Sequence, residues 1–139
     1  MARLNHERIV AAIAAAELTT SGEIRVFIER GDLAGDPLPF AEQKFLEFGM
    51  HRTAERNAVL ILVAPKSQKF AAVGDEGVHR KCGVEFWQQL VDAMREHFKR
   101  EEFTDALVEA IESAGRLLAQ HFPRKQDDRN ELPDAPLES

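Results

Sequence analysis

The sequence has few of the residues that cross-link a chain or anchor it in a membrane. Its single cysteine, Cys82, allows neither a disulfide within the chain nor a metal site built from several cysteines. The longest apolar run, residues 58–65, is much shorter than the roughly 20 residues of a membrane-spanning helix, and residues 1–16 include Glu7 and two arginines. These absences exclude a disulfide scaffold and predict a cytoplasmic protein without direct membrane insertion.

The chain also has fewer positive than negative side chains, with 18 Lys and Arg residues, 24 Asp and Glu residues and a net charge of −6. Such a chain repels nucleic-acid phosphates, so we expect no nucleic-acid partner. In contrast, 44% of the 139 residues are hydrophobic and nine are Phe. This composition is typical of one globular domain with its own core.

Apolar spacing divides the chain into helices and strands. Residues 5–18 have helical spacing, whereas residues 23–29 alternate as a strand does. After a predicted loop over 31–39, residues 40–48 predict a second helix, and residues 58–64 are apolar throughout, as in a central strand. The remaining predictions are a turn at 65–68, an antiparallel strand at 69–73, and two helices whose apolar positions span 87–98 and 103–118. The sequence thus predicts an α/β domain over residues 1–123 and a polar, flexible tail over residues 124–139.

The order of these elements brings three distant segments together. A helical crossover favours parallel pairing of the first two strands, and the third strand runs back beside the second. We therefore expect convergence at one end of the sheet of Ser21-Gly22-Glu23, Arg56-Asn57 and Gly74-Asp75-Glu76-Gly77.

The chemistry of this corner suits a hard cation and a phosphate. Ca²⁺ and Mg²⁺ prefer carboxylate, amide and carbonyl oxygens, so Glu23 and Asp75 are the main candidate metal ligands, with Glu76 and Asn57 as auxiliary ones. Arg56 could bind a phosphate through paired hydrogen bonds, which makes Arg56 and Asp75 the candidate catalytic residues.

A purely structural interpretation remains open for the same residues. Glu23 could be an ordinary residue at a strand start, and Arg56 could simply pair with Glu23 or Asp75. The segment from Gly74 to Gly77 could be a turn that needs positive φ angles.

Other reactive side chains have weaker patterns. The five histidines (His6, His51, His79, His97 and His121) lack the spacing of a zinc site, so none is assigned as a ligand. Cys82 follows three basic residues that could lower its pKa, but a partly buried, inert thiol explains it as well.

The same segments resemble the TPM domain family, named for a thylakoid lumen phosphatase and its relatives. Ile13 and the run from Ser21 to Val26 are similar to the family's first helix and strand. The rest of the resemblance is carried by Thr53, Arg56-Asn57-x-Val59-Leu60-Ile61, Gly74-Asp75-x-Gly77, Phe86-Trp87 and Asn130-x-Leu132-Pro133-Asp134, the last as in short soluble bacterial members.

This resemblance implies a three-layer α/β/α sandwich, with a small mixed sheet of three or four strands flanked by about four helices. It also implies Ca²⁺ or Mg²⁺ binding and either of two functions. One is an accessory module that binds a protein partner, such as a LemA-type or membrane-associated TPM protein. The alternative is a metal-dependent phosphatase acting on a phosphorylated small molecule, although the sequence has no recognisable phosphatase nucleophile loop.

Overall fold

The fold was analysed in a computed structural model, which describes residues 4–124 and 136–138. A four-stranded sheet has the order β3-β2-β1-β4, in which β1 is parallel to β2 and β4, and β2 is antiparallel to β3. The helices and strands are α1 (His6–Glu17), β1 (Glu23–Ile28), α2 (Pro37–Glu47), β2 (Ala58–Ala64), β3 (Lys69–Gly74), α3 (Glu76–Lys99), α4 (Phe103–His121) and β4 (Leu137–Glu138), with short 3-10 turns at Met50–Arg52 and Pro65–Ser67.

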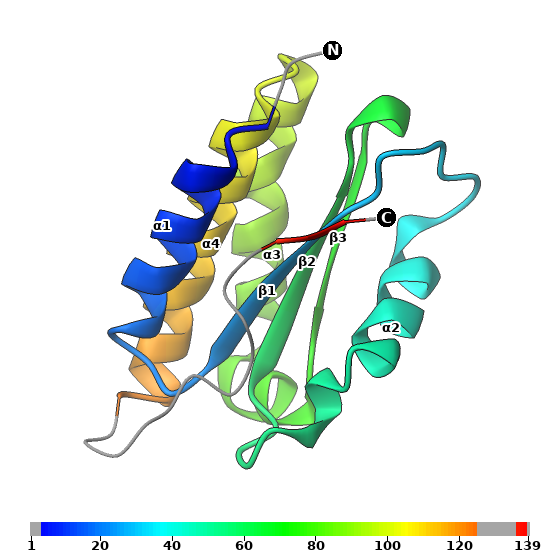
Figure 1. Cartoon of the computed structure of the whole chain (residues 1–139). Helices are drawn as coiled ribbons and strands as arrows, with labels where there is room; N and C mark the ends of the chain where they lie inside the picture. Colours follow the sequence, from blue (N-terminus) through cyan, green and yellow to red (C-terminus); the bar gives the residue numbers. More distant parts are fainter. Residues whose placement is uncertain (1–3, 125–135, 139) are drawn as a thin grey trace.

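Helices cover both faces of the sheet and give it three layers (Figure 1). One face packs against α1, α3 and α4 through Ile24, Val26, Val59, Ile61 and their neighbours. The other face packs against α2, where Ala58, Leu60 and Leu62 meet Ala41 and Phe45. The predicted α/β/α sandwich with a small mixed sheet is therefore confirmed.

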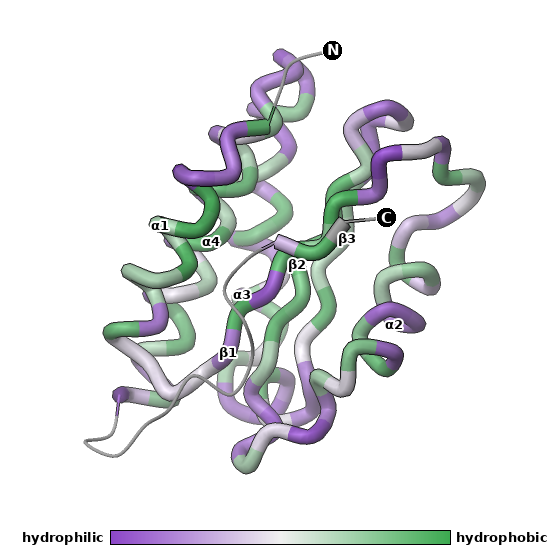
Figure 2. Tube along the Cα trace, in the orientation of Figure 1, coloured by the Kyte–Doolittle hydropathy of each residue, from purple (hydrophilic) through white to green (hydrophobic). Residues whose placement is uncertain are grey.

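The apolar run of β2 explains its central place in this sandwich. All seven of its residues are buried, because alternate side chains enter the two opposite cores. Figure 2 shows hydrophobic colour along this strand and hydrophilic colour along the loops at the lower end of the sheet. The helices that the structure describes include none long and apolar enough to cross a membrane.

The second helix begins earlier than its apolar spacing predicts. Asp36 accepts a hydrogen bond from the Leu38 amide, and Pro37 occupies the first helical position, where its missing N–H is not needed. The predicted loop over 31–39 is therefore too long, because Pro37 and Pro39 lie in the first turn of the helix and not in a loop.

The third helix also begins earlier than predicted, directly after β3. The Asp75 side chain caps it by accepting a hydrogen bond from the Glu76 amide at 2.8 Å. Gly83 interrupts the helix with a φ of 70°, which separates the segment before it from the long apolar stripe that follows. The apolar stripe predicts only the part of the helix after Gly83, because residues 76–82 do not follow its spacing.

Most of the predicted tail, including Asn130 to Asp134, lies outside the described residues. Its final described part, β4, pairs with β1 through Phe27 and Leu137. This edge of the sheet thus gains a short strand that the polar composition of the tail did not predict.

Candidate functional site

The strand register brings two buried carboxylates to the same end of the sheet. Glu23 pairs with Ala58, and the Asp75 amide donates a hydrogen bond to the Ala58 carbonyl at 3.0 Å. Side chains of directly paired residues point to one face, so Glu23, Ala58 and Asp75 form a row on the face that α2 covers. Glu23 and Asp75 are both buried, with exposures of 3% and 6%. The predicted parallel pairing of the first two strands is confirmed.

Arg56 binds Asp75 with two hydrogen bonds. Its Nε donates to Asp75 Oδ2 at 2.6 Å and its Nη2 donates to Asp75 Oδ1 at 2.8 Å. Arg56 itself has a positive φ of 53°, a backbone conformation that is uncommon for a residue with a side chain. Of the two ion pairs considered from the sequence, the structure contains the one with Asp75.

Several interactions shift the pKa of Asp75. Burial raises it, but the hydrogen bonds from Arg56 and from the Glu76 amide, together with the nearby charges of Arg56 and His51, hold the pKa below its usual value. The hydrogen bond to Asp75 raises the pKa of Arg56 in turn. Asp75 is therefore an anion throughout the neutral pH range.

Gly77 allows the helix start to approach the Arg56 turn. Its amide donates to the Arg56 carbonyl at 2.9 Å, and a Cβ atom at this position would lie 2.5 Å from the carbonyl oxygens of Glu55 and Arg56. Neither Gly74 nor Gly77 has a positive φ. The turn that needs positive φ angles was therefore the wrong interpretation, since close backbone contact is what requires Gly77.

Asn57 and Glu76, predicted as auxiliary ligands, lie in different surroundings. The Asn57 amide nitrogen is 3.3 Å from both Ser21 Oγ and Glu55 Oε2, and Ser21 Oγ donates to the same Glu55 oxygen at 2.6 Å. Glu76 is exposed and lies 4.0 Å from Arg56 Nη1. The sequence interpretation missed Glu55, although it directly precedes the Arg56-Asn57 pair.

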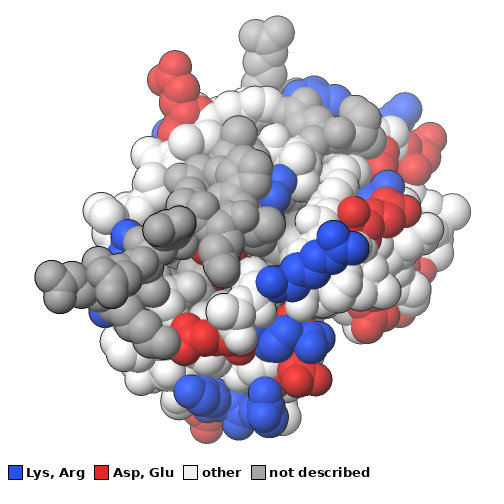
Figure 3. Space-filling model, turned by 60° about the horizontal axis from the view of Figure 1, so that its bottom comes forward, with Lys and Arg blue, Asp and Glu red and all other residues white. Residues whose placement is uncertain are grey.

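The turn before β2 supplies two further polar groups. Thr53 Oγ1 and His51 Nδ1 are buried and have no hydrogen-bond partner among the described residues. Coulombic interaction with His51 contributes to lowering the Asp75 pKa. The sequence spacing of His51 fits no zinc site, and its proximity to Asp75 comes from the fold. Figure 3 shows Lys and Arg side chains interspersed with Asp and Glu at this end of the molecule.

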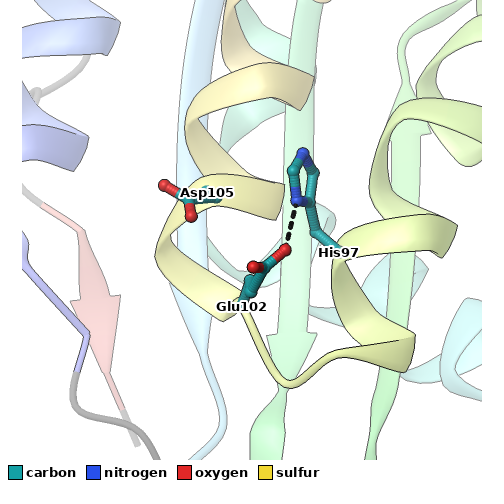
Figure 4. Close-up of side chains that lie close together, drawn as sticks. All are labelled: His97, Glu102 and Asp105. Carbon is teal, nitrogen blue, oxygen red and sulfur yellow. Dashed lines mark hydrogen bonds and ion pairs between the residues drawn. The ribbon is translucent and has the colours of Figure 1, made fainter.

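A second charged cluster lies at the turn between α3 and α4. His97 Nδ1 is 2.9 Å from Glu102 Oε1, and His97 Nε2 is 2.5 Å from Glu109 Oε2. Glu102 and Asp105 both lie near the His97 ring (Figure 4). The Glu102 hydrogen bond raises the pKa of His97, and Glu109 adds to the effect against some loss by burial. The sequence interpretation missed this cluster because it assigned no histidine a role.

Cys82 is a partly buried thiol, and burial raises its pKa despite the adjacent charge of Lys81. This geometry favours the inert thiol among the two interpretations of Cys82.

Comparison with known proteins identifies the family of the folded domain. The family model of the TPM domain matches residues 2–117, which is most of the chain. The chain belongs to the TPM domain family. A comparison with curated proteins gives no match.

Solved structures share this TPM fold. The NMR structure of the BA42 protein from the psychrophilic bacterium Bizionia argentinensis is 37% identical, with a TM-score of 0.89 over 99% of this chain and 97% of that one. The N-terminal domain of the cg2496 protein from Corynebacterium glutamicum is 16% identical, with a TM-score of 0.64 over 96% of this chain and 77% of that one. An N-terminal domain from P. gingivalis is 14% identical, with a TM-score of 0.65 over 84% and 76% of the two chains. The last two likenesses concern the fold alone.

Proposed function

We propose that this TPM domain binds Ca²⁺ or Mg²⁺ at the end of the sheet and acts as an accessory module for a protein partner. The observation that carries the proposal is the row of Glu23, Ala58 and Asp75, in which Ala58 pairs with two buried acidic residues on neighbouring strands. Burying two like charges near each other is costly unless cations compensate them. Arg56 pairs with Asp75, and Glu23 also has a polar or charged partner within the chain.

The donor atoms in this row fit a hard cation. Asp75 Oδ1 accepts two hydrogen bonds, from Arg56 and from the Glu76 amide, whereas Oδ2 accepts one, from Arg56 Nε. Since each carboxylate oxygen has two lone pairs, Oδ2 has one left for a cation. Thr53 Oγ1 adds a buried hydroxyl with no hydrogen-bond partner among the described residues. Oxygen donors of this kind are the ligands that Ca²⁺ and Mg²⁺ prefer.

Each predicted residue has a distinct part in this proposal. Glu23 and Asp75 would hold the cation, while Glu76, exposed at the start of α3, and Asn57 would act through neighbouring groups or water. Arg56 would fix the orientation of Asp75 through their paired hydrogen bonds. A bound cation would tie together three segments that are distant in the sequence and so rigidify this end of the domain.

A phosphatase is the second candidate, and the exposure of Arg56 favours it. The Arg56 side chain is 41% exposed, and its Nη1 has only a 4.0 Å contact with Glu76. This nitrogen could bind a phosphate oxygen while the other two nitrogens hold Asp75. A cation held by Asp75 and Glu23 would supply charge neutralisation for the phosphate. The accessory role is preferred because the sequence has no recognisable phosphatase nucleophile loop.

Partner and compartment follow from the same proposal. A LemA-type or membrane-associated TPM protein is the expected kind of partner. A cytoplasmic location is favoured by the single cysteine, whose thiol is partly buried.

Thermal unfolding with added Ca²⁺ or Mg²⁺ tests cation binding. A cation that binds only the folded state at 100 times its Kd stabilises that state by about 2.7 kcal/mol. We expect Glu23→Gln and Asp75→Asn to reduce this gain, and Asp105→Asn, a control in the His97 cluster, to keep it. An equal gain in all three variants would contradict the assignment.

Hydrolysis of an aryl phosphate, with and without Mg²⁺ or Ca²⁺, separates the two functions. The accessory role predicts no turnover under any of these conditions. Cation-dependent turnover that Arg56→Ala and Asp75→Asn both abolish would instead establish the phosphatase. Turnover that neither variant changes would exclude this corner as its active site.

A further inference from the structure

The edge of the sheet formed by β3 is open to solvent. β3 is the terminal strand in the order β3-β2-β1-β4, and no other strand of the described chain pairs with its outer side. A cavity of about 440 Å³ lies along this edge, between the start of α2 and the first half of α3. Its lining comprises Asp36, Pro37, Leu38, Glu42, residues 70–74, His79, Trp87 and Val91. We call this cavity the β3 groove.

Alternate residues of β3 direct their backbone groups into the β3 groove. The Asp75 amide donates to Ala58, so this pair belongs to the hydrogen-bonded positions of the antiparallel ladder. Residues 71 and 73 then also bond to β2, whereas Phe70, Ala72 and Gly74 turn their N–H and C=O groups to the outer side. These outward groups form the template that an added strand requires.

The walls of the β3 groove are apolar and held in place. The Trp87 indole donates to His79 Nδ1 at 3.2 Å, and a Cβ atom on Gly74 would lie 2.5 Å from its ring. The indole therefore rests directly on the end of β3. On the opposite wall, Leu38 of α2 is 44% exposed, so its side chain is accessible for contact with an added strand.

The rim on the α2 side is acidic. Asp36 and Glu42 are both exposed there, and the whole chain carries a net charge of −6. Lysine or arginine side chains that reach from an added strand toward α2 would meet these carboxylates.

We propose that the β3 groove binds an extended peptide segment of a partner protein, in which apolar residues alternate with Lys or Arg. The segment adds a strand to β3, because Phe70, Ala72 and Gly74 offer it backbone hydrogen bonds. Its apolar side chains pack on Trp87 and Val91, and its basic side chains face Asp36 and Glu42. The proposal rests on the accessory role argued above and assigns the β3 groove as the surface that binds the partner. Binding at this groove requires no cation.

A single strand fits the β3 groove better than a second copy of the chain. The groove is recessed, since residues of α2 and α3 form its two walls on either side of β3. In a second copy the same helices would flank the incoming β3, so edge pairing would require them to fit between the walls of the groove, whereas a single strand carries no flanking helices.

Fluorescence provides a direct test, because Trp87 is the only tryptophan of the chain and lines the β3 groove. The probe is a capped eight-residue peptide of alternating valine and lysine, titrated into the full chain in the presence of a chelator. We expect a saturable change in Trp87 emission and amide shifts centred on residues 70–74. A peptide of the same sequence with every second backbone amide N-methylated should bind at least tenfold more weakly.

Variants test the acidic rim. Glu42→Lys should weaken the lysine peptide severalfold and improve binding of a valine–glutamate peptide. Glu112→Lys, an equal charge change on the exposed side of α4, should change neither affinity by more than the general effect of net charge. Glu42 is chosen over Asp36 because Asp36 caps α2.

Three results would overturn the proposal. They are equal affinity for the N-methylated peptide, amide shifts away from residues 70–74, and a concentration-dependent dimer whose interface is the β3 edge. Cation binding is measured separately by thermal unfolding, so failure of the β3 groove and failure of the cation site are distinguishable.

Discussion

The two charged clusters of this domain differ in how the fold assembles them. The corner cluster, built around Arg56 and Asp75, joins segments 19 residues apart and places a carboxylate that is only 5% exposed. The His97 cluster joins residues 5 and 12 positions apart, and its side chains are 24% to 49% exposed. In the corner the Asp75 carboxylate is therefore poorly hydrated and depends on Arg56, which is itself 41% exposed, whereas both members of each His97 pair remain in contact with water.

This difference indicates which substitutions should have a large electrostatic effect on the stability of the fold. Removing one partner of a buried pair leaves the other charge without compensation, while exposed pairs contribute little because water and salt screen them. Substitutions in the corner cluster should therefore destabilise the fold more, and should respond to acid. Substitutions in the His97 cluster should have small effects near neutral pH.

The largest expected effect comes from Gly77→Ala. A Cβ atom there would lie 2.5 Å from two backbone oxygens of the Arg56 turn, and backbone cannot move aside as a flexible side chain can. We expect a loss of about 3 kcal/mol in the free energy of unfolding, measured by urea denaturation. In Gly31→Ala, where the nearest atom is a side-chain oxygen at 3.4 Å, the change should stay within about 0.5 kcal/mol. Similar losses in both variants would show that the close approach at Gly77 is not important.

Asp75→Asn should have the next largest effect. It removes the charge that accepts hydrogen bonds from Arg56 and from the Glu76 amide, which costs about 2 kcal/mol. Because the folded-state pKa of Asp75 lies below its unfolded value, its contribution is present above about pH 4 and is lost as the pH falls through the folded-state pKa. Denaturation curves of both proteins between pH 7 and pH 2 should therefore converge in acid. A constant gap would contradict the assignment.

His97→Gln should have the smallest effect, below about 1 kcal/mol, because its ion pairs are partly exposed. The folded-state pKa of His97 is raised, so its contribution is fully present below about pH 6.5 and is lost as the pH rises through the folded-state pKa. The wild type should exceed the variant most at pH 6 and least at mildly alkaline pH. The opposite trend in thermal unfolding would show that His97 is not held by Glu102 and Glu109.

The sequence predicts most of the fold because its strands have distinct patterns. The apolar run of β2 and the alternation of β1 identify a buried strand and its neighbour, and the crossover helix sets their parallel pairing. The early starts of α2 and α3 were missed because Pro37 and the segment before Gly83 do not follow an apolar stripe. Helix capping at Asp36 and Asp75, a local hydrogen-bond signal, could have indicated both.

The topology of the strands predicts which segments meet at the candidate site, but it does not predict which side chains pair there. Parallel strands place Glu23 and Asp75 at one end of the sheet, but side-chain pairing depends on local geometry. The positive φ of Arg56 and the close approach of Gly77 decide that Arg56 meets Asp75, and neither has a sequence pattern of its own. The His97 cluster depends on the tight turn between α3 and α4, where Glu101 has a φ of 59°.

Amide chemical shifts during a Ca²⁺ titration are the most direct test of whether Glu23 and Asp75 bind a cation, because both charged clusters are observed in one experiment. We expect localised, saturable shifts at Glu23, Thr53 and Asp75, with His97, Glu102 and Asp105 unchanged. Shifts confined to His97, Glu102 and Asp105, or no saturable shift at either cluster, would contradict it.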